Sequence, residues 1–368
     1  MRVVMSGGGT AGHVYPALSV ADRLVAERDE VLFVGTPNGL EARLATEAGL
    51  DFHALPAQGF DRARPLTLIT AAFRAVSSAY KAWRLLGSWR PDVVMGFGAY
   101  VSLPVGLAAV VRGVPLVLHE QNSVPGMANK FLSRWARKVG VTYADSVKLL
   151  AHPDRTVVTG NPVRDAVRNA SRDAGRARLG IAEDALLLLV FGGSRGARHL
   201  NTALVGLHSA LMAKERLVIV HVTGPKELAS VTASLEAAGY DPRRWLLFDY
   251  LTDMGDIIAA ADLVVARSGA TSIAELTTLG VPALVAPYPY ATDDHQTKNA
   301  ASLAEAGAAV VVTDSELDGQ RFGDTVLSLL DDAGQRATMA AASRSLGRPD
   351  AAERVVALAR EVVGAPAR

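Results

Sequence analysis

Residues 2–13, Arg-Val-Val-Met-Ser-Gly-Gly-Gly-Thr-Ala-Gly-His, join a short apolar run to a glycine-rich loop. Residues 186–197, Leu-Leu-Leu-Leu-Val-Phe-Gly-Gly-Ser-Arg-Gly-Ala, repeat this arrangement in the second half of the chain. Glycines let a backbone approach a phosphate closely, and the helix that follows such a loop offers unpaired N–H groups to an anion. Each half of the chain is therefore predicted to open with a strand, a phosphate-binding loop and a helix.

Short apolar runs alternate with helical patterns along both halves. Between the runs 3–5 and 31–34, for example, apolar residues recur at helical spacing from Ala17 to Val25. The expected strands are 3–5, 31–34, 93–95, 116–118 and 139–141, then 186–191, 217–222, 246–248, 263–265, 283–286 and 309–312. This alternation predicts parallel sheets covered by helices on both faces, with ligands bound beyond the carboxyl ends of the strands.

The chain has 368 residues, which is more than one hydrophobic core usually covers. Turn residues at Gly160-Asn161-Pro162 interrupt the pattern between the halves. The expected fold class is therefore α/β, with two Rossmann-like domains, 1–162 and 163–342, whose parallel sheets face a central cleft. A last helix is expected to begin near Asp350, and periodicity leaves open which domain it packs on.

Composition excludes several classes of site and partner. The chain has no cysteine, which rules out disulfides, thiolate nucleophiles and cysteine zinc sites. Its formal net charge is +1, so the chain as a whole is not drawn to nucleic acid. Its first residues lack the long apolar core of a signal peptide, so export is not expected. The uncharged stretch 93–111 is as long as a membrane span, but its three glycines and Pro104 favour a strand, a loop and a packed helix.

The second half also contains polar segments suited to a nucleotide sugar. Residues 266–275 follow an expected strand and open a helix, so the backbone N–H groups of 268–271 would meet a pyrophosphate. Glu275 lies about one helical turn further on, where its carboxylate would accept from two ribose hydroxyls. Amide and imidazole groups within 290–299 suit sugar hydroxyls. A nicotinamide site is disfavoured, since the strand 31–34 ends without the acidic residue that would hold a ribose.

Eight short motifs follow one another in a fixed order. They are Gly8-Gly-Thr-Ala-Gly-His13, Gly96-Phe-Gly-Ala-Tyr-Val-Ser102, His119-Glu-Gln-Asn122, Gly160-Asn-Pro-Val-Arg164, Gly192-Gly-Ser-Arg-Gly-Ala197, Arg267-Ser-Gly-Ala270, Glu275 and Asp294-His-Gln296. On this ordered set the chain resembles the MurG family, the N-acetylglucosaminyltransferases of peptidoglycan lipid synthesis, over nearly its whole length. Arg195 and His295 depart from some members, which have a glutamine at the first position and a doubled glutamine at the second.

The resemblance implies a GT-B fold in which the C-terminal domain binds most of the donor and the last helix, 343–368, packs back on the N-terminal domain. It implies transfer of GlcNAc from UDP-GlcNAc to the 4-hydroxyl of undecaprenyl-pyrophosphoryl-MurNAc-pentapeptide, with inversion at the anomeric carbon. It also implies a peripheral enzyme on the cytoplasmic face of the plasma membrane, active in cell-wall synthesis and cell division. Other cell-wall synthesis proteins are expected as partners, and nucleic acid is not.

The positions of the family motifs imply the substrate contacts. Ser194 and Arg164 would hold the diphosphate. Leu251 would meet the uracil through its backbone, and Glu275 would bind the ribose. Gln296, Asn122 and residues 10–12 would contact GlcNAc. The full set expected to bind substrate is Thr10, Ala11, Gly12, Asn122, Arg164, Ser194, Leu251, Ser268, Gly269, Ala270, Thr271, Glu275, His295 and Gln296. The expected acceptor-side loop is Gly98, Ala99, Tyr100 and Ser102.

Inverting transfer needs a base for the acceptor hydroxyl and stabilisation of the departing UDP. His13 is the first candidate for the base, because an ordinary imidazole accepts a proton near neutral pH, and Glu120 is the second. Alternatively, His13 would only bind the acceptor or cap its helix. Arg164 and helix N-termini would stabilise the leaving group. The donor motifs have no Asp-x-Asp or other metal cluster near them, so neither a metal nor another cofactor is expected.

The segment 62–90 has the composition of a membrane-facing surface. It contains six basic residues and no acidic one, interleaved with aromatic and aliphatic side chains. Such a segment suits an anionic membrane surface. The same spacing equally suits a core stripe made of Ile69, Phe73, Val76, Tyr80 and Trp83.

Three other functions share parts of this pattern. A different GT-B transferase would act on a glycolipid or natural-product acceptor, although the motifs 96–102 and 119–122 argue against it. A UDP-GlcNAc 2-epimerase has the same architecture and needs no acceptor. A sugar-nucleotide sensor or membrane scaffold would bind without turnover, and would not need the candidate base.

Overall fold

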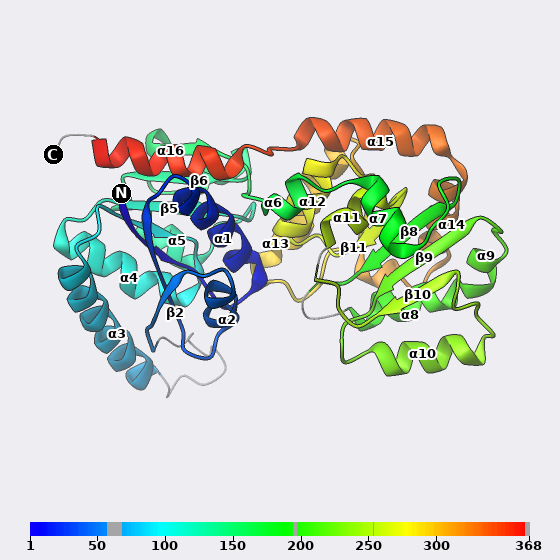
Figure 1. The fold of residues 1–368 in the computed structure, drawn as a ribbon, viewed down its shortest axis with the longest axis horizontal. Helices are drawn as coiled ribbons and strands as arrows, with labels where there is room; N and C mark the ends of the chain where they lie inside the picture. Colours follow the sequence, from blue (N-terminus) through cyan, green and yellow to red (C-terminus); the bar gives the residue numbers. More distant parts are fainter. Residues whose placement is uncertain (57–67, 194–196, 253, 365–368) are drawn as a thin grey trace. The chain divides into compact units, whose positions relative to one another are not determined.

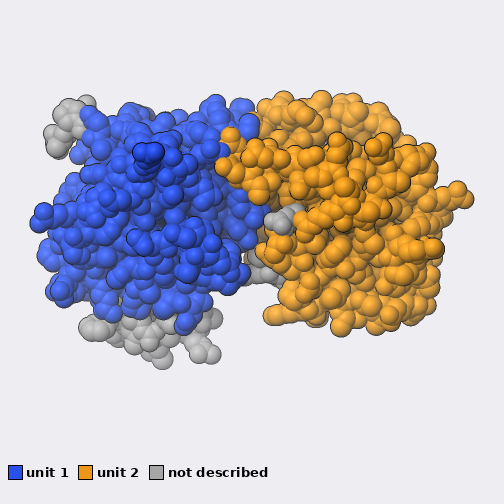
Figure 2. All heavy atoms as spheres, viewed as in Figure 1, with its two compact units in different colours: residues 1–164, 348–368 blue, residues 165–347 orange. Residues whose placement is uncertain are grey.

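Figure 1 shows the computed structural model of the chain, which describes residues 1–56, 68–193, 197–252 and 254–364. The chain forms two compact units, coloured separately in Figure 2: unit 1 is residues 1–164 with 348–368, and unit 2 is residues 165–347. The first crossing between the units thus follows directly on the turn residues at 160–162. Unit 2 is continuous in sequence, whereas unit 1 is not.

Among its described residues, unit 1 contains seven parallel strands in the order β3-β2-β1-β4-β5-β6-β7. They are β1 (Arg2–Ser6), β2 (Glu30–Gly35), β3 (Asp51–Ala54), β4 (Val93–Gly96), β5 (Leu116–Glu120), β6 (Lys138–Val141) and β7 (Thr156–Val158). β1 lies between β2 and β4, with Val3 opposite both Val31 and Val93. The five inner strands coincide with predicted apolar runs. β3 and β7 were not predicted, because these edge strands are largely exposed and carry no apolar run.

Helices cover both faces of this sheet. They are α1 (Ala11–Ala26), α2 (Leu40–Glu47), α3 (Leu68–Trp89), α4 (Ala99–Arg112), α5 (Met127–Leu132) and α16 (Ala351–Gly364). Side chains alternate along β1, so Val3 and Met5 pack in a core with α1 and α16, while Val4 packs in a core with α3 and α4. α1 and α16 lie side by side over the first of these cores (Figure 1).

The part of unit 2 that the structure describes contains six parallel strands in the order β10-β9-β8-β11-β12-β13, each at a predicted apolar run. They are β8 (Leu186–Phe191), β9 (Leu217–Val222), β10 (Trp245–Phe248), β11 (Leu263–Ala266), β12 (Ala283–Val285) and β13 (Ala309–Val311). The helices are α6 (Asp165–Arg168), α7 (Arg172–Leu179), α8 (Arg198–Gly206), α9 (His208–Met212), α10 (Leu228–Ala237), α11 (Met254–Ala260), α12 (Ala270–Leu279), α13 (His295–Glu305), α14 (Gln320–Asp331) and α15 (Ala333–Leu346). The strand order reverses between β8 and β11, so the loops after these strands lie at the point where such sheets bind ligands.

The last helix begins at Ala351, next to the predicted start near Asp350, but the bounds 343–368 that the resemblance implies span parts of two helices in different units. α15 ends at Leu346 and packs on α12 of unit 2, whereas α16 packs on α1 of unit 1. The break comes at Gly347 and Pro349, because proline lacks the N–H that would continue a helix. The backbone at Gly347 also passes close to α12, where a Cβ would lie 2.6 Å from the carbonyl oxygen of Thr277. The chain returns to unit 1 through this short segment.

The uncharged stretch 93–111 forms β4 and most of α4, as predicted. Its side chains Val94, Val105 and Ala109 are fully buried in the core that unit 1 forms with α3 and α4. Among the helices of the described residues, none combines the length and the hydrophobicity needed to cross a bilayer.

Helices α7 and α11 approach each other closely at Gly175, where a Cβ would lie 2.0 Å from the carbonyl oxygen of Asp256. Gly175→Ala must push the two helices apart, so we expect it to lower the free energy of unfolding by about 2 kcal/mol or more. Gly206, at the end of α8, has open space where a Cβ would lie. Gly206→Ala should therefore change the free energy of unfolding by less than about 1 kcal/mol. Denaturant unfolding measures both variants; equal effects would contradict the packing role of Gly175.

Candidate active site

The loops that follow β1, β4 and β5 meet at one edge of the unit 1 sheet, because the carboxyl ends of parallel strands share an edge. His13 lies half-buried in the first turn of α1. Gly98 faces its ring: a Cβ there would lie 3.3 Å from the imidazole, and the φ of Gly98 is 92°, which favours glycine. The buried hydroxyl of Ser102 lies within hydrogen-bond distance of the carbonyls of Ser6 and Gly98, so it ties two of these loops together.

The other predicted acceptor-side residues lie beside this loop. Ala99 and Tyr100 begin α4, and Tyr100 is 39% exposed. A Cβ on Gly9 would lie 3.7 Å from both of them, so the first glycine loop and the start of α4 are neighbours. The structure therefore brings the predicted acceptor-side residues together around His13.

A hydrogen-bond relay, made of His13, Gln121, His119 and Gly160, runs inward from this edge. His13 Nδ1 donates to Gln121 Oε1 at 2.7 Å, and Gln121 Nε2 donates to His119 Nδ1 at 3.1 Å. His119 Nε2 donates to the Gly160 carbonyl at 2.9 Å. Amide and carbonyl oxygens only accept, so each bond fixes which ring nitrogen carries the hydrogen. When neutral, His13 therefore has its proton on Nδ1 and its lone pair on Nε2.

Burial keeps the inner end of the relay neutral. His119 is 1% exposed, and desolvation lowers the pKa of its imidazole from 6.5 to about 4, against the opposing effect of the Gly160 carbonyl. The nearby His13 lowers this pKa further. A neutral His119 accepts from the Gln121 amide throughout the physiological pH range. The amide orientation of Gln121 is fixed in this way, and with it the orientation of His13.

Glu120, the second candidate base, has a structural role in this geometry. Its carboxylate is 1% exposed and accepts from the backbone N–H groups of Asn122 and Gly126, each at 3.0 Å. It also accepts from Asn129 Nδ2 at 2.9 Å. These donors engage both carboxylate oxygens and hold the loop that carries Asn122, a predicted GlcNAc contact. The geometry therefore favours His13 over Glu120 as the base.

The first glycine loop differs from the open phosphate cradle that its sequence predicts. The buried carboxylate of Glu41, in α2, lies beneath it and accepts from the N–H groups of Gly9 at 3.3 Å and Thr36 at 2.9 Å. Gly8 leaves room for this carboxylate, since a Cβ there would lie 2.5 Å from it. A carboxylate beneath the loop opposes the binding of an anion at this place. Residues 10–12, the predicted sugar contacts, follow at the more exposed start of α1.

In unit 2, the loops after β11 and β12 carry most of the predicted donor-binding residues. Gly269 caps α12, and Ala270 and Thr271 begin its first turn, whose N–H groups have no partner within the helix. The Thr271 hydroxyl is buried without a partner among the described residues. Glu275 lies one turn further along α12 and is 7% exposed. A helix terminus followed by a carboxylate suits a diphosphate followed by a ribose.

Ser268 and Gln296 hold two of these loops together. Ser268 Oγ donates to the Gln296 carbonyl at 2.9 Å, so this hydroxyl has a structural contact. Gln296 Oε1 accepts from the Tyr288 N–H at 2.9 Å, so the group that Gln296 offers to a ligand is its Nε2, a donor. The neighbouring His295 has its Nδ1 at 2.6 Å from the Thr292 carbonyl.

Arg164 lies in unit 1, not in the predicted domain 163–342. Its guanidinium lies over the Tyr15 ring of α1, 4.3 Å from the ring centroid, and this contact holds it against unit 1. Leu251 follows β10 and packs its side chain in the core of unit 2, which leaves its backbone for a uracil. Ser194 lies outside the described residues.

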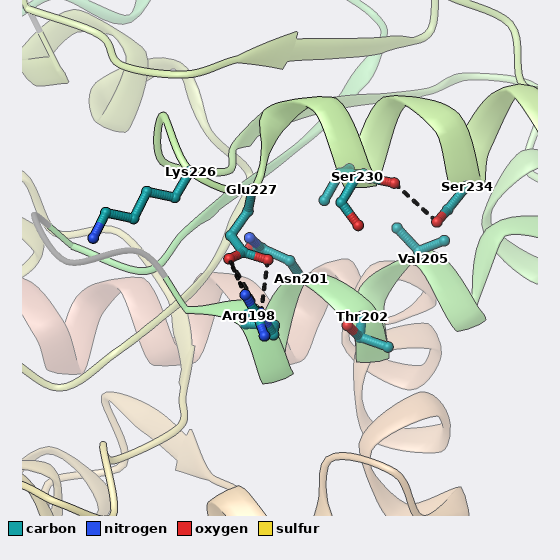
Figure 3. Close-up of a pocket in the computed structure, with 9 residues that line it drawn as sticks. Arg198, Asn201, Thr202, Val205, Lys226, Glu227, Ser230 and Ser234 are labelled. Carbon is teal, nitrogen blue, oxygen red and sulfur yellow. Dashed lines mark hydrogen bonds and ion pairs between the residues drawn. The ribbon is translucent and has the colours of Figure 1, made fainter.

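An open pocket of about 390 Å³ lies between α8 and α10 of unit 2 (Figure 3). Arg198 and Glu227 face each other in it, with Arg198 Nε 3.1 and 3.2 Å from the two carboxylate oxygens. Asn201, which also lines it, is buried and donates to the Thr223 carbonyl. Of the predicted substrate-binding residues that the structure describes, none lines this pocket, so we do not assign it to the donor.

Comparison with known proteins identifies the family. The glycosyltransferase family 28 N-terminal domain matches residues 3–141, and the family 28 C-terminal domain matches residues 187–355. The UDP-N-acetylglucosamine--N-acetylmuramyl-(pentapeptide) pyrophosphoryl-undecaprenol N-acetylglucosamine transferase of Desulfitobacterium hafniense (strain Y51) is 40% identical over 360 residues, 97% of this chain and 98% of that protein. MurG of Acinetobacter baumannii, a crystal structure, is 31% identical with a TM-score of 0.77 and covers 98% of this chain and 100% of that one. The chain belongs to the MurG family.

Membership of the MurG family makes the chain a glycosyltransferase, and its two parallel-sheet α/β units confirm the predicted GT-B fold. The similarly named transferase of Salinibacter ruber is 40% identical over 364 residues, 98% of this chain and 96% of that protein. A putative UDP-N-acetylglucosamine 2-epimerase from Listeria monocytogenes has a TM-score of 0.71 but is only 18% identical, with coverage of 97% of this chain and 95% of that one. Its likeness to this MurG-family chain concerns the fold alone.

Sequence reasoning missed three residues that shape the site. Gln121 lies inside a MurG-family motif, but only the structure shows that it links two histidines. Glu41 lies in a separate helix from the glycine loop that it supports, and nothing in its local sequence marks it. Arg267 also lies in a family motif, and its buried ion pair with Asp314 joins residues far apart in the chain. The only sequence signal available for Gln121 and Arg267 was their place within family motifs.

We expect the relay to be visible in histidine nitrogen shifts. In 15N-labelled protein, neutral His13 should carry its proton on Nδ1 and His119 on Nε2, and the pKa of His119 should be about 4. Gln121→Leu removes both amide contacts, so His13 should lose its fixed tautomer. Gln320→Leu, on the surface of unit 2, is the matched control and should leave both signals unchanged. A neutral His13 protonated on Nε2 in the unmodified protein would rule the relay out.

Proposed function

We propose that this chain transfers GlcNAc from UDP-GlcNAc to the 4-hydroxyl of undecaprenyl-pyrophosphoryl-MurNAc-pentapeptide, the lipid I to lipid II step of peptidoglycan synthesis. Relatives about 40% identical over nearly the whole chain carry this transfer in their names. The observation in the structure that carries the proposal is the relay, which leaves the Nε2 lone pair of His13 for a substrate proton.

The proposed reaction is a single displacement at the anomeric carbon. The acceptor 4-oxygen forms a bond to C1 while the bond from C1 to the UDP oxygen breaks, and the electron pair leaves with UDP. Attack from the opposite face converts the α-linked donor into a β-linked product. His13 Nε2 takes the hydroxyl proton, and Gln121 Oε1 still accepts from Nδ1 of the imidazolium that results.

The negative charge that develops on UDP needs stabilisation in this reaction. The N-terminus of α12 offers backbone N–H groups and a partial positive charge. The Arg164 guanidinium would supply a full charge, and Glu275 would orient the ribose. With this charge and the helix N-terminus to stabilise the departing UDP, we propose a reaction without a metal ion or another cofactor.

The test of this function is turnover with UDP-GlcNAc and a short-chain lipid acceptor. The protein should release UDP and form the disaccharide-linked lipid, and the donor alone should give no 2-epimer. His13→Ala should lower kcat by roughly 10²- to 10⁴-fold, since it removes a general base, with little change in the KM for UDP-GlcNAc. His53, exposed on β3, provides the control: His53→Ala should keep full activity.

Two outcomes would contradict these assignments separately. Epimer formed from the donor alone, or transfer only to an unrelated acceptor, would overturn the proposed function. If His13→Ala raised the KM for the lipid acceptor but left kcat intact, His13 would bind the acceptor and another group would be the base.

We further propose that unit 1 attaches peripherally to the cytoplasmic face of the membrane through α3. Val76, Tyr80 and Trp83 are exposed, at 69%, 59% and 38%, so this part of the predicted core stripe does not pack inward. The side chains that α3 buries are instead Ser78, Ala82 and Leu86. Ile69 and Phe73 belong to the part of α3 whose side chains lie outside the described residues.

Aromatic and basic groups meet on this face. The Tyr80 and Trp83 rings stack with centroids 6.2 Å apart, and the Arg112 guanidinium lies 4.0 Å from the Trp83 ring centroid. Lys81 and Arg84 are exposed on the same helix. Exposed rings among cations suit the interface of an anionic bilayer, where the rings insert and the cations meet lipid headgroups.

Flotation with vesicles that contain anionic lipid tests this surface. Tyr80→Glu with Trp83→Glu should abolish most of the binding, because both changes put a negative charge where an exposed ring meets the interface. Trp89 is unsuitable for this test, since it is half-buried beneath the Arg2 guanidinium. Val25→Glu, at an exposed valine of α1, should leave binding unchanged. Equal flotation of a folded double variant and the unmodified protein would remove α3 from the membrane surface.

A further inference from the structure

Arg267 stands directly before the donor-binding turn of α12, yet its side chain points into unit 2 and is 6% exposed in total. Its Nη1 donates to the carbonyls of Ala286 and Pro287, both at 3.1 Å. Its Nη2 forms an ion pair with Asp314 Oδ1 at 2.5 Å. These contacts hold the guanidinium inside the unit, so Arg267 does not act as a phosphate ligand in this arrangement.

Asp314, in the 3₁₀ turn η5 (Asp314–Glu316), connects Arg267 to His199 of α8. His199 Nδ1 lies 2.8 Å from Asp314 Oδ2, and His199 Nε2 lies 3.0 Å from Asp318 Oδ2. Carboxylates only accept, so both contacts are hydrogen bonds at once only when the imidazole carries two protons. The hydrogen bond with Asp314, aided by Asp318, accordingly raises the pKa of His199 above its ordinary value of 6.5 against the effect of burial.

The two carbonyls that accept from Arg267 belong to residues that directly precede Tyr288, whose backbone contacts the predicted donor-binding residue Gln296. Tyr288 follows Pro287, and its N–H donates to Gln296 Oε1 at 2.9 Å. The Tyr288 ring lies 5.8 Å from the Arg267 guanidinium. Displacement of Arg267 would therefore move the backbone that sets the amide orientation of Gln296, a residue that the family motifs predict to contact GlcNAc.

We propose that His199, Asp314 and Arg267 form a brace that positions Gln296 for the donor sugar. The inference rests on the proposed function, because UDP-GlcNAc is the donor whose binding would depend on the brace. His199 and Asp314 are positioning residues, since neither belongs to the predicted substrate-binding set. Their effect should appear in the KM for UDP-GlcNAc more than in kcat.

The brace depends on pH through the charge of His199. The charged groups that face it are Asp314 and Asp318, with Arg267 behind Asp314, whereas Glu316 of η5 is engaged by Arg321 and Thr313. Below the raised pKa of His199 both ring nitrogens donate, and the brace is complete. As the pH rises through that pKa, one hydrogen bond is lost and the two carboxylates lose their shared cation. Donor affinity should therefore fall on the alkaline side, above pH 6.5.

Steady-state kinetics of the full chain, with UDP-GlcNAc varied at saturating lipid acceptor between pH 6 and 9, test the brace. His199→Leu should raise the KM for UDP-GlcNAc roughly fivefold or more at neutral pH, with kcat changed less than about twofold. His199→Asn keeps an N–H near the position of Nδ1 but does not titrate, so it should restore much of the KM and remove its alkaline rise. His53→Asn, on unit 1, is the control and should have the same KM for UDP-GlcNAc, with the same pH dependence, as the unmodified protein.

The Asp318→Asn variant provides a second test of the brace. It should leave the core of unit 2 undisturbed, because the Asp318 side chain is 73% exposed. This change removes one carboxylate from His199, so the alkaline rise in KM should move to lower pH. An unchanged KM in folded His199→Leu, or an alkaline rise that Asp318→Asn leaves in place, would overturn the brace. Absence of any turnover of UDP-GlcNAc by the unmodified protein would instead overturn the proposed function.

Discussion

The buried hydrogen bond from His119 to the Gly160 carbonyl joins the candidate active site of unit 1 to the segment through which the chain leaves that unit. Gly160 has a φ of 82°, and a Cβ there would lie 2.5 Å from the side chain of Arg348, where the chain returns. Gly160 thus contacts the end of β5 through this hydrogen bond and lies close to the segment by which the chain returns. Because His119 orients Gln121, and Gln121 orients His13, the direction of the candidate base depends on the backbone at this crossing.

The fold was predictable from the sequence wherever an apolar run marks a buried strand. Inner parallel strands are covered on both faces, so they appear as continuous apolar runs, and the structure has a strand at every predicted run. The edge strands β3 and β7 have exposed side chains and give no such signal. The start of the last helix near Asp350 was predicted from its capping residues, whereas the wider bounds 343–368 were wrong, because Gly347 and Pro349 separate two helices that belong to different units.

Some residues of the candidate site were likewise predictable from the sequence, whereas others became known only from the structure. The motifs indicated that His13 and Gly98 lie at helix starts beyond strand ends, and that Glu275 lies one turn inside a helix, and the structure has them there. The partners of such residues depend on tertiary packing, as with Glu41 beneath the first glycine loop and Asp314 beside Arg267. The exposure of the α3 aromatics likewise depends on how that helix is rotated about its axis, which helical spacing leaves open.

The position of α16 has a consequence for biosynthesis. Residues 165–347 form a complete unit before α16 leaves the ribosome. The strands of unit 1 are synthesised earlier, but Val355 and Ala359 of α16, which complete one of its cores, are synthesised last. Domains of most chains fold from the N-terminus onward as they are synthesised. Here the second unit is complete first, and docking of the final helix closes the core that was started earliest. During that interval the core that β1 and α1 form on this face of unit 1 lacks the side chains of α16.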